Sequence, residues 1–66
     1  MGHIEQRGRF FYIDGTLVLM IKESRDLGIC IVGSRSKPII THITDEDVAR
    51  RIAIQECKEI VSRMDD

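Results

Sequence analysis

The residues best suited to chemistry lie in one short polar loop, residues 33–37, which reads Gly-Ser-Arg-Ser-Lys. Two hydroxyls, two cations and glycine-permitted backbone amides suit an anion such as a phosphate group. The loop is not a P-loop, because the Gly-x-x-x-x-Gly-Lys-Ser/Thr pattern is absent and no helix follows directly. A solvated connector between strands is the alternative interpretation. The candidate residues for binding an anion or a nucleic acid are Ser34, Arg35, Ser36, Lys37 and Arg9.

Soft metal ligands and nucleophiles are few: Cys30, Cys57, His42 and His3. They show no Cys-x-x-Cys or His-x-x-x-His spacing, and a structural zinc site needs four such ligands. Both cysteines lie in apolar surroundings, so we expect them to be buried small hydrophobes. A catalytic cysteine needs a base, and nothing in the sequence places His42 beside either thiol. We therefore predict no catalytic residues, no metal and no cofactor, and expect that the protein is not an enzyme.

The net charge of −1 argues against a protein whose affinity depends on neutralising many phosphates. Cations nevertheless exceed acids in residues 1–43, whereas acids exceed cations in residues 44–66. A nucleic-acid-binding regulator that uses the basic residues of the sheet half is therefore kept as an alternative. Rings interleaved with cations occur only in residues 9–12, and we expect core packing to use at least two of those rings.

A chain of 66 residues makes one domain and is marginally stable alone. Its two cysteines are too few for a disulfide scaffold, so oligomerisation is the favoured source of additional stability. The longest apolar run, residues 17–21, is far shorter than the roughly 20 residues of a spanning helix, and no signal-peptide pattern is present. We expect a cytoplasmic protein with reduced thiols and no membrane partner.

A hairpin is indicated by Asp14-Gly15 between two apolar runs, because a type I′ turn needs positive φ at both central residues. A regular ladder then pairs Phe11 with Val18 and Phe10 with Leu19. The expected faces are, on one side, Phe10, Tyr12, Leu17, Leu19 and Ile21, and on the other Phe11, Ile13, Val18 and Met20. A single helix cannot cover both faces, so the second is expected to meet another chain.

The flanking segments complete the predicted order. Residues 1–8 are expected to be flexible, residues 29–33 to form a third strand, and residues 39–43 to pair as an edge strand or lead into the helix. Thr44 is the expected N-cap, with Asp47 reaching back in a capping-box manner. The helix carries a broad apolar stripe centred on Ala49, Ala53, Cys57, Ile60 and Met64.

These observations predict an α+β domain over residues 9–66, with three or four antiparallel strands followed by one long helix. The expected function is a small non-catalytic cytoplasmic adaptor, inhibitor or regulatory protein that binds another protein and forms a homodimer or higher oligomer. The alternatives are the nucleic-acid-binding regulator and an oligomer that binds a phosphorylated small ligand. The predicted protein interface is Phe11, Val18, Met20, Ile52 and Ile54.

Overall fold

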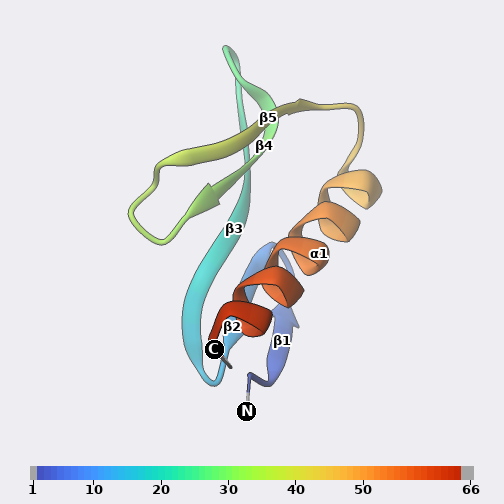
Figure 1. Ribbon diagram of the computed structural model, residues 1–66. Helices are drawn as coiled ribbons and strands as arrows, with labels where there is room; N and C mark the ends of the chain where they lie inside the picture. Colours follow the sequence, from blue (N-terminus) through green and yellow to red (C-terminus); the bar gives the residue numbers. More distant parts are fainter. Residues whose placement is uncertain (1, 65–66) are drawn as a thin grey trace.

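A five-stranded antiparallel meander carries one C-terminal helix on one of its faces (Figure 1). This computed structural model describes residues 2–64. The elements in chain order are β1 Ile4–Arg7, β2 Phe10–Ile13, β3 Thr16–Ser24, β4 Gly28–Gly33, β5 Pro38–Ile43 and α1 Glu46–Met64. The α+β meander followed by one helix is confirmed, with five strands where three or four were predicted.

The additional strand, β1, lies in the segment that we expected to be flexible. Arg7 pairs with Phe10, so the β1–β2 hairpin has a two-residue loop, and Gly8 adopts a φ of 61° at its first position. Glycine at this position is typical of a type II′ turn. At the other end of β1, the Asp14 carboxylate accepts hydrogen bonds from the amides of Gly2 and His3 at 3.0 and 2.8 Å. The turn holds β1 at one end and the two hydrogen bonds hold it at the other. The hydrogen bonds from His3 and Gly2 also lower the pKa of Asp14.

The β2–β3 hairpin turns at Asp14 and Gly15, whose φ values of 50° and 82° confirm the predicted positive φ at both positions. The pairs Ile13–Thr16 and Tyr12–Leu17 are also as predicted. Beyond them the register shifts, because Phe11 pairs with Leu19 instead of Val18. One extra residue of β3 therefore forms a β-bulge at this point.

The bulge changes which residues share a face. Phe11, Ile13, Leu19 and Ile21 are at most 4% exposed and form the core under α1. Val18 packs against the same core. The predicted faces were therefore wrong, because the regular ladder places Leu19 and Ile21 on one face of the sheet and Phe11 and Ile13 on the other.

The helix contacts the sheet through Ala49, Ala53 and Cys57, all fully buried. These small side chains let the helix axis approach the strands closely. The larger residues beside this stripe pack against the core while remaining partly exposed: Ile52, Ile54, Ile60 and Val61. The wide apolar arc of α1 therefore packs against the core of its own chain.

Within residues 2–64, α1 lacks the continuous apolar length that a membrane-spanning helix needs.

Helix α1 begins one residue later than predicted. The Asp45 carboxylate accepts a hydrogen bond from the Val48 amide at 2.9 Å, and the Asp45 carbonyl accepts one from the Ala49 amide at 3.1 Å. These bonds define Asp45 as the N-cap. Thr44 and Asp45 are both favourable capping residues, but Val48 now occupies the third helical position, so the predicted capping box with Asp47 does not form.

Replacing the cap should lower stability by a modest amount. We expect Asp45→Ala to cost about 1 kcal/mol, because the Val48 amide loses its acceptor. Thr44→Ala, one residue earlier, is the matched control and should change the melting temperature little. Thermal unfolding followed by circular dichroism measures both, and a larger loss for Thr44→Ala would contradict the assignment.

Candidate functional site

The face of the sheet turned away from α1 carries a group of neighbouring apolar residues, of which Phe10 is the most exposed. Cross-strand pairs connect Phe10 to Met20, Met20 to Val32, and Tyr12 to Leu17. Phe10 is 45% exposed, whereas Val32 is only 3% exposed. Tyr12, Leu17 and Met20 are half-buried. We call these five residues the outer-face patch.

Charged groups border the outer-face patch at its β1 side. Arg7 places its guanidinium 5.1 Å from the centroid of the Tyr12 ring, within the range of a cation–π interaction. The same side chain donates to Glu5 at 2.9 Å. This hydrogen bond, with the positive charge of Arg7, lowers the pKa of Glu5. The patch therefore combines apolar and aromatic surface with a rim that contains both signs of charge.

The structure separates the residues of the predicted protein interface. Met20 lies in the outer-face patch, but Phe11 is fully buried under the helix and offers no surface to a partner. Val18, Ile52 and Ile54 pack against the core of their own chain. Phe10, Tyr12 and Leu17 take the place of these residues because the bulge reverses the expected assignment of faces, and sequence periodicity gives no signal for the bulge.

The loop at residues 34–37 is a tight connection between β4 and β5. The Ser36 amide donates to the Gly33 carbonyl at 2.9 Å, and the Gly33 amide donates to the Lys37 carbonyl at 3.0 Å. The amides of Ser36 and Gly33 are therefore hydrogen-bonded within the hairpin and are not available to bind an anion. Ser34, Arg35, Ser36 and Lys37 are all exposed, an arrangement that fits the solvated connector.

A substitution in this loop should raise stability. Ser36 has a φ of 62°, in the left-handed region that costs an L-residue about 1–2 kcal/mol and costs glycine little. Since glycine loses more chain entropy on folding, we expect Ser36→Gly to stabilise the protein by about 0.5–1 kcal/mol. Ser34→Gly, without positive φ, is the control and should not stabilise. Urea unfolding measures the difference.

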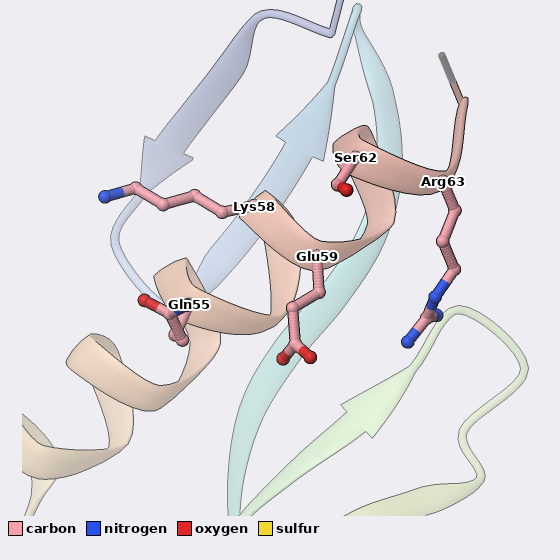
Figure 2. A pocket seen from close by; sticks show the side chains of 5 residues that line it. All are labelled: Gln55, Lys58, Glu59, Ser62 and Arg63. Carbon is pink, nitrogen blue, oxygen red and sulfur yellow. The ribbon is translucent and has the colours of Figure 1, made fainter. Parts of the chain in front are cut away.

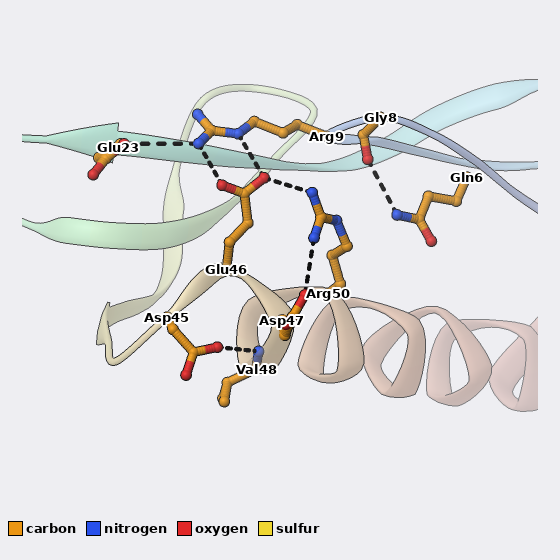
Figure 3. A network of polar contacts seen from close by, with 9 residues as sticks. All are labelled: Gln6, Gly8, Arg9, Glu23, Asp45, Glu46, Asp47, Val48 and Arg50. Atoms are coloured by element: carbon orange, nitrogen blue, oxygen red, sulfur yellow. Dashed lines mark hydrogen bonds and ion pairs between the residues drawn. The ribbon is translucent and has the colours of Figure 1, made fainter.

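Arg9, the fifth predicted anion-binding residue, is instead part of an ion-pair network with the start of α1 (Figure 3). Its Nη2 and Nε donate to the two oxygens of Glu46 at 2.6 and 3.1 Å, and Glu23 lies 3.7 Å away. Arg50 pairs with the same Glu46 at 2.8 Å and with Asp47 at 3.2 Å. The bidentate ion pair between Arg9 and Glu46 connects the β1–β2 turn to the first turn of α1. Arg9 and the β4–β5 loop lie on opposite sides of β3, so the structure does not bring these candidates together.

This network should make stability depend on pH. The hydrogen bond from Arg9 lowers the pKa of Glu46 below its ordinary value of 4.5. A lowered folded-state pKa contributes stability above the ordinary value, and that contribution is lost as the pH falls through the folded-state pKa. We expect Glu46→Gln to melt below the wild type at neutral pH, with the difference shrinking in acid. A difference independent of pH would show that the Glu46 charge contributes nothing.

The remaining polar features of residues 2–64 do not form an enclosed site. A hollow on the helix surface is lined by Gln55, Lys58, Glu59, Ser62 and Arg63, all from α1, and Figure 2 shows Lys58 pointing away from Arg63. Cys57 is buried, and burial raises the pKa of its thiol. Within residues 2–64 no three His, Cys, Asp or Glu side chains are grouped so that they could hold a metal ion.

No protein-family model, curated protein or solved structure matches the chain.

Proposed function

We propose that this protein is a small non-catalytic adaptor, inhibitor or regulatory protein of the cytoplasm, and that it binds another protein through the outer-face patch as a homo-oligomer. The observation that carries the proposal is the apolar face opposite α1. Folded domains bury such faces or use them for binding, and aromatic residues and methionine are enriched in protein interfaces. Phe10, Tyr12 and Met20 lie together on this face.

The shape of the surface also favours a protein partner. The outer-face patch lies on a sheet surface, whereas small-molecule sites are concave and enclose most of their ligand. Tyrosine, as in Tyr12, is among the residue types that contribute most to protein binding. Phenylalanine, as in Phe10, is also enriched in protein interfaces. The Glu5 and Arg7 rim would then affect the rate of association more than the residence time.

A single-stranded nucleic acid is the second candidate, because two aromatic rings and Arg7 lie on the exposed sheet surface, as base stacking requires. Two observations weigh against it. The Arg7 guanidinium already lies over the Tyr12 ring, where a base would stack. Glu5 pairs with that arginine and adds negative charge at the same border.

A pull-down from the native cytoplasm, with and without nuclease, tests the proposal. We expect wild-type protein to retain a specific protein partner after nuclease treatment, and Met20→Glu on the outer-face patch to lose it. Ile39→Glu is the matched control, because Ile39 is 48% exposed but lies outside the patch. Loss of the captured material on nuclease treatment, together with tight salt-sensitive binding to random oligonucleotides, would favour the second candidate instead.

A further inference from the structure

The two edges of the sheet differ in their ability to accept another strand. β5 begins with Pro38, which has no amide hydrogen, and its ladder with β4 is irregular at two places. His42, near its end, has a φ of 56°. Proline and bulges are devices that protect a sheet edge against further pairing. β1 contains neither, and its four residues pair regularly with β2.

One hydrogen bond shows which backbone amides and carbonyls of β1 point away from β2 and are free to pair with another strand. The Asp14 amide donates to the His3 carbonyl at 2.8 Å, so His3 bonds toward β2. Residues of an antiparallel ladder alternate between bonding to the neighbour and pointing away from it. Glu5 and Arg7 therefore bond toward β2, while Ile4 and Gln6 point their amides and carbonyls outward. Helix α1 packs mainly against β2 to β5, with Val61 beside Gly2, just before the start of β1. Gln6 and Arg7, at the other end of β1, are exposed.

We propose that a second copy of this chain adds to β1 as an antiparallel strand, with Gln6 opposite Gln6 of the second copy. Only outward-pointing residues can form the bonded pairs, which restricts the pairing to a few registers. The register centred on Gln6 places Glu5 opposite Arg7 of the second copy, twice. The register that pairs Ile4 with Gln6 places two Glu5 carboxylates opposite each other, and like charges directly opposite are destabilising.

The charges within one copy already have the required arrangement. Glu5 and Arg7 lie on the outer face of the same strand, 2.9 Å apart. In the proposed pair, each carboxylate would lie between its own arginine and that of the second copy. The two sheets become one continuous sheet, and the two outer-face patches adjoin. The inference deepens the homo-oligomer of the proposed function by specifying the edge and the register.

Charge reversal tests the register. We expect wild-type protein to form a concentration-dependent dimer in analytical ultracentrifugation at low salt, and Glu5→Arg or Arg7→Glu each to weaken it about tenfold or more. The double variant, which exchanges the two charges, should dimerise like the wild type, and an equimolar mixture of the single variants should associate more tightly than either alone. Lys58→Glu, on the exposed side of α1, changes net charge as Arg7→Glu does and should leave the dimer intact.

Three results would overturn the proposal: a wild-type monomer at all concentrations, single reversals without effect, or a double variant that stays dissociated. Hydrogen exchange provides a measurement that needs no variant, because the Gln6 amide should exchange more slowly as wild-type concentration rises, and an unchanged rate also refutes the dimer. Met20→Glu separates the two proposals, since it should abolish partner capture and preserve the dimer. If the wild-type protein does not dimerise but still captures its partner, the proposed β1 dimer is refuted and partner binding through the outer-face patch is not.

Discussion

Phe11→Ala should leave the chain largely unfolded, whereas Phe10→Ala, one residue earlier, should leave it folded. Phe11 is fully buried under α1, and removing a buried phenylalanine side chain costs about 3–5 kcal/mol. A single hydrophobic core in a domain of this length rarely supplies more than about 3–5 kcal/mol of stability. Phe10 is 45% exposed on the opposite face, so its truncation removes little buried surface. Urea unfolding followed by circular dichroism at low protein concentration measures both.

Comparing the stability losses of Phe10→Ala and Phe11→Ala shows which of the two side chains lies on the buried face of the sheet. A larger loss for Phe10→Ala would restore the regular ladder that the sequence alone predicts, in which Phe10 and Leu19 share a face. Equal losses would mean that the outer-face patch is buried as completely as the core, which only a second layer from another chain can provide. Repeating the measurement at higher concentration separates that case, because stability of an assembly rises with concentration.

Local patterns with a specific backbone requirement predicted their elements correctly. Asp14-Gly15 supplies two residues that tolerate positive φ, and both adopt it. The helical spacing of Ala49, Ala53 and Cys57 identified the buried stripe of α1. The Gly8-Arg9 turn carries a signal of the same kind, because glycine at the first loop position indicates a hairpin between β1 and β2.

The face assignment failed because the sequence of β3 gives no alternation to follow. Every residue from Leu17 to Ile21 is apolar, so shifting the ladder by one residue keeps apolar side chains on both faces. The bulge then depends on how the whole sheet packs against α1, which is tertiary information. The ion pair of Arg9 could not be predicted for a related reason: its partner Glu46 lies 37 residues away, and counting charges along the chain cannot pair them.

Deleting Val18 should leave the protein folded, whereas deleting Tyr12 should unfold it. β3 has one residue more than β2 between the turn and the Phe11–Leu19 pair, so removing Val18 allows a regular ladder with every observed pair retained. The loss of its partial packing against the core should cost about 1–2 kcal/mol. Thermal unfolding of the two deletion variants, with the dispersion of their amide NMR spectra, measures the contrast.

Removing Tyr12 has the opposite effect on the ladder, because it shortens the strand that is already the shorter one. Ile13 stays at the turn, so Phe11 moves into the position of Tyr12 and its side chain turns to the outer face. The core then loses its largest fully buried side chain, and the pairing of β1 with β2 is shifted as well. If both deletions were equally damaging, β3 would have no surplus residue to lose. A tolerated Tyr12 deletion would require β1 and β3 to slide together past β2, which the Asp14 carboxylate opposes by binding the amides of Gly2 and His3.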